Sequence, residues 1–181
     1  MKKKIVILGS TGSIGKTTFS ILKKNKNFFN IKLLTTNRNI KELIKQSKTF
    51  NVKNLIVTDK KQFLIAKKIL KNKKINIFNN FNSLNKIFKK KVDYTMSSIS
   101  GFEGLEPTLN MIRFSKKIAI ANKEAIICAW SLIRKEMTKN NTNFIPIDSE
   151  HFSIWSLLNE SNKKKVDEII ITASGLSLIH I

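Results

Sequence analysis

The sequence predicts an α/β protein with a doubly wound, mainly parallel β-sheet. Two observations carry this prediction. Short apolar runs alternate along the chain with longer segments in which apolar residues recur at helical spacing. The first run, residues 5–8, is apolar throughout and ends at Gly9, as expected of a strand that is covered on both faces. Such alternation implies parallel strands that are joined by right-handed helical crossovers.

The expected elements follow in order. Residues 5–8 are expected to form the first strand, and residues 14–24 the first helix, because apolar residues recur there at helical spacing, namely Ile14, Phe19, Ile21 and Leu22. Pro107 suits the first turn of its helix, where a backbone N–H has no partner to lose. Further strands are expected at 31–35, 54–57, 75–78, 92–96, 117–121, 144–147 and 167–172, and further helices at 40–47, 61–70, 84–89, 104–113, 123–139 and 149–158.

The composition excludes several classes of protein. A chain of 181 residues with 41% hydrophobic and 25% charged residues is globular, with room for one domain and the start of a second. The single cysteine, Cys128, excludes an intramolecular disulfide and a cysteine-rich zinc site. Apolar runs are too short for a membrane span, and the run after Met1 is too short for a signal peptide. We therefore expect a cytoplasmic protein with no membrane partner.

The formal charge of +22 raises the alternative of a basic nucleic-acid-binding protein. Lys, Asn and Ile, which all have A/T-rich codons, make up 79 of the 181 residues, whereas Arg occurs three times. Arginine is the residue preferred for bidentate phosphate and guanine contacts. A solvated lysine coat is therefore favoured over a specific nucleic-acid groove.

A glycine-rich turn, Gly9-Ser10-Thr11-Gly12-Ser13-Ile14-Gly15, follows the first strand and opens the first helix. Glycine permits a tight turn and close approach of the backbone to a pyrophosphate, and the helix N-terminus stabilises its charge. An isolated glycine pattern could equally be a plain connection. In this context it indicates a Rossmann-like dinucleotide-binding domain.

The end of the second strand indicates which dinucleotide binds. An NAD enzyme usually has an acid there, but this chain has Asn37, Arg38 and Asn39. A guanidinium suits a 2′-phosphate, so NADP(H) is the expected cofactor. The alternative is that Arg38 is an ordinary surface cation.

Two polar clusters follow later strands. Asn122-Lys123-Glu124 opens a helix at the sheet edge where α/β ligands bind. The alternative is ordinary helix capping, with Asn122 as the N-cap and Glu124 as an acid in the first turn. Asp148 and Glu150 form a D-x-E pair of hard oxygen ligands suited to Mg²⁺ or Mn²⁺, with helix capping as the alternative.

Three other residues have side chains that could carry special roles but are expected to be structural. Cys128 is expected in the core, on an apolar helix face with its neighbouring isoleucines. Trp130 and Trp155 are expected to be packing residues.

Together the motifs resemble one family. GSTGSIG at 9–15, ANKE at 121–124, PIDSEH at 146–151 and TASG at 172–175 have the order and spacing found in 1-deoxy-D-xylulose 5-phosphate reductoisomerase. The resemblance implies a homodimeric, NADPH- and Mg²⁺- or Mn²⁺-dependent oxidoreductase and isomerase of the methylerythritol phosphate route to isoprenoid precursors. Its substrate would be the phosphosugar 1-deoxy-D-xylulose 5-phosphate, and its product 2-C-methyl-D-erythritol 4-phosphate. The alternative of another NADP-linked oxidoreductase is disfavoured by the occurrence of both the N-K-E and the D-S-E motif.

The resemblance also implies roles for individual residues. Position 37 is often glycine in the family, so Asn37 is a departure from its pattern. Cofactor contacts would come from Thr11, Gly12, Ser13, Ile14, Asn37, Arg38, Asn39, Asn122 and Glu124. Substrate contacts would come from Lys123, Ser149, Glu150 and Ser174, metal ligands would be Asp148 and Glu150, and Lys123 and Glu150 would carry the chemistry.

The match divides the chain and ends near residue 175. Residues 1–147 would be an NADP-binding Rossmann-like domain, and residues 148–175 the truncated start of an α+β catalytic domain. Residues 176–181 read LSLIHI, where the family continues with a second glycine and a Pro-Phe-Arg run. Because a transposon mosaic end used in sequencing libraries encodes LSLIHI, we expect a non-native tail, with a genuine frameshift as the rival. Without the family's lid, third carboxylate ligand and C-terminal helical domain, we expect the fragment to be inactive.

Overall fold

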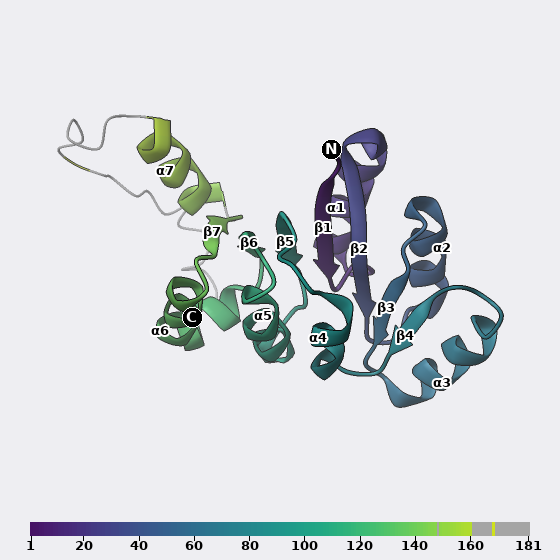
Figure 1. The fold of residues 1–181 in the computed structure, drawn as a ribbon. Helices are drawn as coiled ribbons and strands as arrows, with labels where there is room; N and C mark the ends of the chain where they lie inside the picture. Colours follow the sequence, from purple (N-terminus) through teal and green to yellow (C-terminus); the bar gives the residue numbers. More distant parts are fainter. Residues whose placement is uncertain (148, 161–167, 169–181) are drawn as a thin grey trace, which may run out of the picture. The chain divides into compact units, whose positions relative to one another are not determined.

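The computed structural model describes residues 1–147, 149–160 and 168 (Figure 1). Contacts between residues divide the chain into two units, Met1–Ile145 and Pro146–Ile181. The first unit contains a parallel sheet with helices on both faces. In the second unit the described secondary structure is one helix, α7 (Ser149–Glu160), on which the rings of Phe152 and Trp155 lie 5.6 Å apart.

A seven-stranded sheet has the spatial order β4-β3-β2-β1-β5-β6-β7. Every recorded ladder from β4 through β6 is parallel, as the alternating pattern predicted. The strands are β1 (Lys3–Leu8), β2 (Phe29–Thr36), β3 (Asn54–Val57), β4 (Asn76–Phe78), β5 (Tyr94–Ser97), β6 (Lys117–Ile120) and β7 (Asn143–Pro146).

Six α-helices connect these strands. Three short 3₁₀ turns accompany them, namely η1 (Lys26–Phe28), η2 (Phe81–Ser83) and η3 (Phe102–Gly104). The helices are α1 (Ser13–Lys24), α2 (Ile40–Phe50), α3 (Lys60–Ile69), α4 (Leu84–Ile87), α5 (Leu105–Ile112) and α6 (Lys123–Lys139). Among the residues that the structure describes, no helix is both long enough and apolar enough to cross a membrane.

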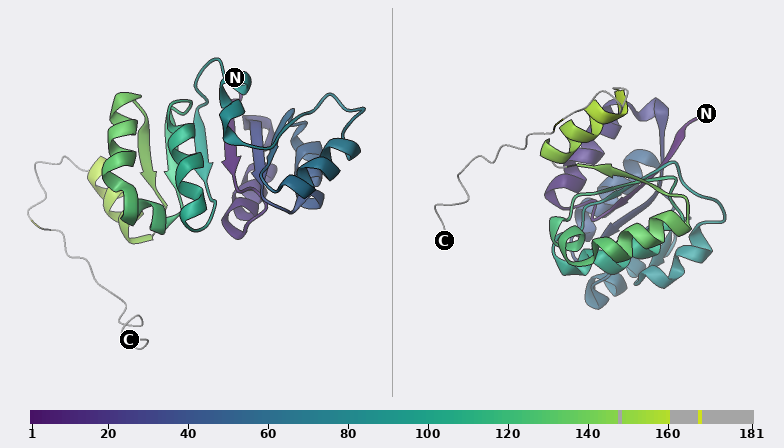
Figure 2. Two further views of the ribbon diagram at one scale, coloured as in Figure 1. Left: turned by 90° about the horizontal axis from the view of Figure 1, so that it is seen from below. Right: turned by 90° about the vertical axis from the view of Figure 1, so that its left-hand side faces the viewer.

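Both faces of the sheet are covered, which explains the all-apolar first strand (Figure 2). Ile5 and Ile7 of β1 belong to a core that α1, α2 and α3 complete on one face. Val6 and Leu8 point to the other face, where they pack with residues of η2, α4 and α5. A third cluster lies between β6, α5 and α6.

Strand β1 is the point at which the direction of winding reverses. The chain proceeds from β1 through β2 and β3 to the edge strand β4, and then returns to place β5 on the other side of β1. Crossovers therefore leave the carboxyl end of β1 in opposite directions. In open α/β sheets, the crevice at such a switch point is where ligands bind.

Most predicted elements are confirmed, with shifted ends that have local causes. Strand β5 begins at Tyr94 because Val92 forms only an isolated bridge with Ser115. Helix α4 ends at Ile87 because Phe88 has extended backbone angles. The start of the helix predicted at 104–113 is a 3₁₀ turn, so α5 begins at Leu105. The predicted strand at 167–172 lies outside the described residues.

The prediction that Cys128 is a core residue is wrong. Helix α6 buries Ala125, Ala129, Ile133 and Met137, which are spaced four residues apart. Cys128 lies off that face and is exposed, as is its neighbour Ile127. Trp130 packs edge-on against Phe144, with ring centroids 5.4 Å apart, in agreement with a packing role.

Candidate nucleotide-binding site

The glycine turn joins β1 to α1 at the switch point. Gly9 has a φ of +72°, in the left-handed region that favours glycine, and a Cβ there would lie 2.8 Å from the carbonyl oxygen of Ser98. A Cβ on Gly15 would lie 2.2 Å from the carbonyl oxygen of Gly9. Neither clash can be relieved without moving the backbone, so the fold itself requires both glycines.

Gly12 is different from the other two glycines of the turn. Its φ is −75°, and a Cβ there would meet its nearest neighbour, the Gly9 carbonyl oxygen, at an ordinary 3.4 Å. The protein chain alone would accept a side chain at this position. Gly12 instead faces the cleft, where a Cβ would occupy space that a bound group could use.

The turn presents free hydrogen-bond donors. Gly12 is the N-cap of α1, no side chain caps the helix, and its first turn contains no acid. Within the described part of the chain, the backbone N–H groups of Thr11, Ser13, Ile14 and Gly15 have no hydrogen-bond acceptor. Unpaired amides at the positive end of a helix form an anion-binding site.

Hydrogen bonds to the end of strand β2 hold the turn in place. The backbone N–H of Ser10 donates to the Thr35 carbonyl oxygen at 2.9 Å, and the Gly9 N–H donates to Thr35 Oγ1 at 2.8 Å. Thr11 Oγ1 lies 2.6 Å from Thr36 Oγ1. Adjacent strand ends thus fix the position of the turn before any ligand binds.

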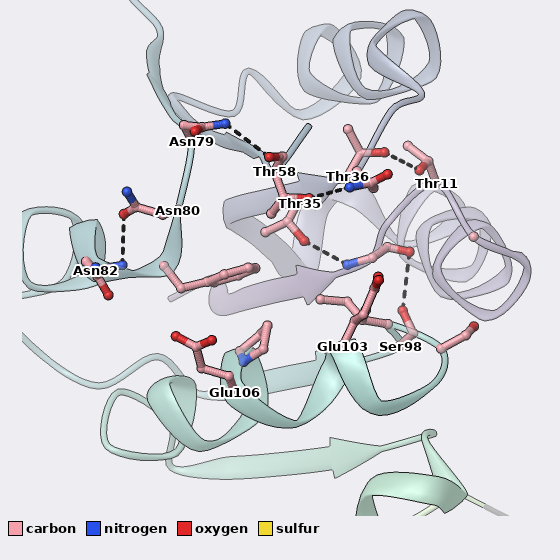
Figure 3. A pocket seen from close by; sticks show the side chains of 17 residues that line it. Thr11, Thr35, Thr36, Thr58, Asn79, Asn80, Asn82, Ser98, Glu103 and Glu106 are labelled. Carbon is pink, nitrogen blue, oxygen red and sulfur yellow. Dashed lines mark hydrogen bonds between the residues drawn. The ribbon is translucent and has the colours of Figure 1, made fainter. Parts of the chain in front are cut away.

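A cleft of about 510 Å³ opens over the carboxyl ends of these strands (Figure 3). Its volume lies in the range of sites for small molecules and cofactors. The lining groups come from the ends of β1 to β5, from η2 and η3, and from the start of α5. They are Gly9, Thr11, Gly12, Thr35, Thr36, Asn37, Thr58, Asn79, Asn80, Phe81, Asn82, Ser98, Ile99, Ser100, Glu103, Glu106 and Pro107.

The two sides of the cleft differ in charge. Glu103 and Glu106 contribute carboxylates to the cleft from η3 and α5, and the glycine turn contributes the N-terminus of α1 (Figure 3). Anionic phosphates are therefore favoured at the glycine turn, and the α5 side suits neutral or hydrogen-bond-donating parts of a ligand.

Arg38 follows β2 beside the cleft and is 79% exposed. Its Nε lies 3.4 Å from Asp59 Oδ2, and Asp59 also caps α3 by accepting a hydrogen bond from the Gln62 N–H. That hydrogen bond, together with the Arg38 charge, lowers the pKa of Asp59 below its ordinary value. A carboxylate fixed in this way contacts the Nε side of the guanidinium.

The neighbours of Arg38 have separate roles. Asn37 lines the cleft, and its Nδ2 donates to Thr58 Oγ1 at 2.8 Å. Asn39 is the N-cap of α2, because its Oδ1 accepts from the Glu42 N–H. The structure therefore brings Thr11, Gly12 and Asn37 into one cleft, with Arg38 and Asn39 next in sequence.

Asn122 is buried rather than facing that cleft. Its Oδ1 accepts from the Ala125 N–H and so caps α6, while its Nδ2 donates to the carbonyl oxygens of Ile99 and Gly101. Lys123 and Glu124 are exposed in the first turn of α6. These three residues do not line the cleft, and their roles remain predictions.

The predicted metal and substrate residues fall largely beyond what the structure describes. Asp148 and Ser174 lie outside the described residues. Ser149 and Glu150 begin α7, but their side chains are not described. In the described part of the chain, no group of three His, Cys, Asp or Glu residues could hold a metal ion.

Sequence reasoning missed most of the residues that line the cleft. Thr58, Asn79 and Ser98 each come directly after a strand, namely β3, β4 and β5. The rule that ligands bind at the carboxyl ends of parallel strands could have identified them. Glu103 and Glu106 carried no comparable signal, since their place in the cleft depends on how α5 packs.

Two family models match the chain. The model for 1-deoxy-D-xylulose 5-phosphate reductoisomerase matches residues 5–130, and the model for the C-terminal domain of the same enzyme matches residues 144–181. The reductoisomerase of Pelagibacter ubique (strain HTCC1062) is 60% identical over 175 residues, which are 96% of this chain and 45% of that protein. The chain thus spans a little under half the length of the curated relatives it matches.

Solved structures agree with this match. The structure of the reductoisomerase from Zymomonas mobilis in complex with NADPH has a TM-score of 0.85 at 33% identity, covering 97% of this chain and 46% of that one. A reductoisomerase in complex with NADPH, fosmidomycin and magnesium has a TM-score of 0.75 at 28% identity, and the match covers 82% of this chain and 37% of that one. The predicted Rossmann-like α/β fold is confirmed. Since the first family model alone covers more than half of the residues, the chain belongs to the 1-deoxy-D-xylulose 5-phosphate reductoisomerase family.

Proposed function

We propose that this chain supplies the NADPH-binding domain of a reductoisomerase that converts 1-deoxy-D-xylulose 5-phosphate to 2-C-methyl-D-erythritol 4-phosphate. The observation that carries the proposal is the glycine turn. Gly9 and Gly15 are required by the fold, whereas Gly12 is open to the cleft beside unpaired amides at the N-terminus of α1. A pyrophosphate is the group that makes use of such a space.

The residues present fit NADPH. Thr11, Gly12, Ser13 and Ile14 would hold its pyrophosphate, and Arg38 its 2′-phosphate, with Asn37 and Asn39 beside it. The Asp59 contact is to Nε, and the terminal nitrogens of Arg38 make no ion pair or hydrogen bond with another described residue. Those nitrogens can bind a phosphate bidentately.

The rest of the reaction would use Lys123 of the first unit together with residues of the second unit. Asp148 and Glu150 are the proposed ligands of Mg²⁺ or Mn²⁺, because paired carboxylates are hard oxygen donors. Lys123, Ser149, Glu150 and Ser174 would bind the phosphosugar, with Lys123 compensating its negative charge. When bound, NADPH supplies a hydride, and the divalent cation acts as a Lewis acid toward the substrate oxygens.

The biological setting is part of the same proposal. The full-length enzyme would act as a cytoplasmic homodimer, with no specific nucleic-acid partner. Because the match to the Pelagibacter ubique relative covers 45% of that protein, we expect this chain to bind NADPH without turning over substrate. A turnover assay of this chain beside a version extended to the full reading frame tests that expectation.

Cofactor binding is tested by titrating the chain with NADPH and NADH. Arg38→Met should weaken NADPH binding by about 10- to 100-fold, since charge-assisted hydrogen bonds are lost, and leave NADH binding unchanged. Arg134→Met removes an exposed arginine of α6 and serves as the matched control. Equal effects of both variants would show that overall charge, and not a 2′-phosphate site, governs binding.

A further inference from the structure

Gln46 lies on the buried face of α2, behind the glycine turn, and is 1% exposed. Its Nε2 donates to the Ser10 carbonyl oxygen at 2.9 Å and to Glu42 Oε1 at 3.3 Å. These two acceptors determine the orientation of the amide, because the reversed group would set Oε1 against two oxygens. In the described part of the chain, Oε1 is then left buried without a partner. The hydrogen bond to the Ser10 carbonyl is thus made by an amide whose other end is unpaired.

This contact sets the direction of an amide in the turn. The Ser10 carbonyl and the Thr11 N–H belong to one planar trans peptide, so they point in opposite directions. Since Gln46 holds the carbonyl toward α2, the Thr11 N–H is directed away from α2. Thr11 lines the cleft, and its N–H has no acceptor among the described residues.

The same side of α2 also reaches the segment that contains Arg38. The Glu42 N–H donates to Asn39 Oδ1 at 3.1 Å, and Glu42 Oε1 accepts from Gln46. Asn39, next to Arg38, and Ser10 in the turn are therefore both hydrogen-bonded to residues of α2. Helix α2 holds the two proposed phosphate sites in a fixed relation.

Resting on the proposed NADPH function, we propose that Gln46 is a positioning residue that fixes the phosphate turn in its binding conformation. It acts through the Ser10–Thr11 peptide and not by touching the cofactor. Loss of its hydrogen bond should weaken binding of ligands that contain the pyrophosphate by about 3- to 10-fold, the effect of one neutral hydrogen bond. Ligands that use only the 2′-phosphate site should be unaffected.

The test compares Gln46→Met with wild type for three ligands. NADPH contains both phosphate groups, NADH contains only the pyrophosphate, and 2′-AMP contains only the 2′-phosphate. Gln46→Met should weaken NADPH and NADH but not 2′-AMP, whereas Arg38→Met should weaken NADPH and 2′-AMP but not NADH. Gln62→Met makes the same chemical change in α3 and should alter none of them.

The outcomes separate this proposal from the proposed function. A wild-type chain that binds no NADPH would overturn the function itself. If the wild-type chain binds NADPH but Gln46→Met weakens all three ligands equally, or weakens none of them, the positioning role of Gln46 is refuted. If circular dichroism shows that Gln46→Met does not fold, NMR spectra of the wild-type chain provide the test. The signals of the Gln46 side-chain NH₂ group should shift when NADH is added and stay unchanged when 2′-AMP is added. Unchanged signals with NADH would contradict the proposal.

Discussion

Alanine at Gly12 and alanine at Gly15 should have opposite consequences, although the two positions are one helical turn apart. The Gly15 methyl would lie 2.2 Å from the Gly9 carbonyl oxygen and 2.7 Å from the Ser10 Cα, so only backbone movement could relieve the overlap. Overpacking typically costs about 1–3 kcal/mol, and these short distances favour about 3 kcal/mol. For a domain of this size the melting temperature should fall by about 6–12 °C.

Gly12→Ala should leave stability nearly unchanged. The new methyl meets its nearest atom at 3.4 Å, and a φ of −75° suits alanine. Alanine is a poorer N-cap than glycine by about 0.5–1 kcal/mol, but it also stiffens the unfolded chain by about 0.4–1 kcal/mol. These effects nearly cancel, so the free energy of unfolding should change by less than about 1 kcal/mol.

Gly12→Ala should act on cofactor binding instead. Its methyl points into the space proposed for the pyrophosphate, so the Kd for NADPH should rise at least about tenfold, or about 1.4 kcal/mol. Thermal denaturation followed by circular dichroism gives the stability of each variant, and NADPH fluorescence titration gives the affinity. Gly12→Ala that melts like Gly15→Ala, or that binds NADPH like wild type, would refute the reasoning.

Three further predictions concern residues outside the turn. Asn122→Ala should lower the free energy of unfolding by about 2–4 kcal/mol, because it removes the α6 cap and leaves the Ile99 carbonyl oxygen without its donor; urea denaturation measures this, and the exposed Asn82→Ala should change little. The hydrogen bond from the Lys4 N–H, with help from Lys116, lowers the pKa of Asp93 below its ordinary 3.8, so its contribution to stability is present above pH 3.8 and is lost as pH falls through the lowered pKa. Asp93→Asn should therefore destabilise the protein at pH 7, and this difference should shrink in acid denaturation curves; a pH-independent difference would contradict the assignment. Cys128 is exposed and should react with a thiol reagent in the native state as fast as it does in urea; slow native reaction would mean that it is covered.

The fold was predictable where it depends on patterns of residues that are close together in the sequence. The apolar residues 5–8 indicated a strand covered on both faces, and Ile5 and Val6 do belong to cores on opposite faces. The glycine turn was predictable because its function needs contiguous residues. Cys128 was misplaced because apolar residues occur on more than one face of α6, and the face that packs inward, with Ala125, Ala129, Ile133 and Met137, is determined by the neighbouring elements of the fold.

The cleft was less predictable, since its walls come from separate strands. Thr58, Asn79 and Ser98 meet only because β3, β4 and β5 take particular places in the sheet. Those places depend on long-range pairing, which local patterns do not encode. Asn122 shows the converse: the capping role that the sequence allowed as an alternative accounts for its hydrogen bonds.

The most direct test of the central claim is NADPH titration of the ¹⁵N-labelled chain, followed amide by amide in NMR spectra. The amides of Thr11, Ser13, Ile14 and Gly15 should shift together with those of residues 36–39. Lys26 and Lys53, which line a separate lysine-rich pocket near the beginnings of β2 and β3, should not move. Shifts spread over the lysine surface, with none in the turn, would contradict the claim that the glycine turn is a nucleotide-binding site.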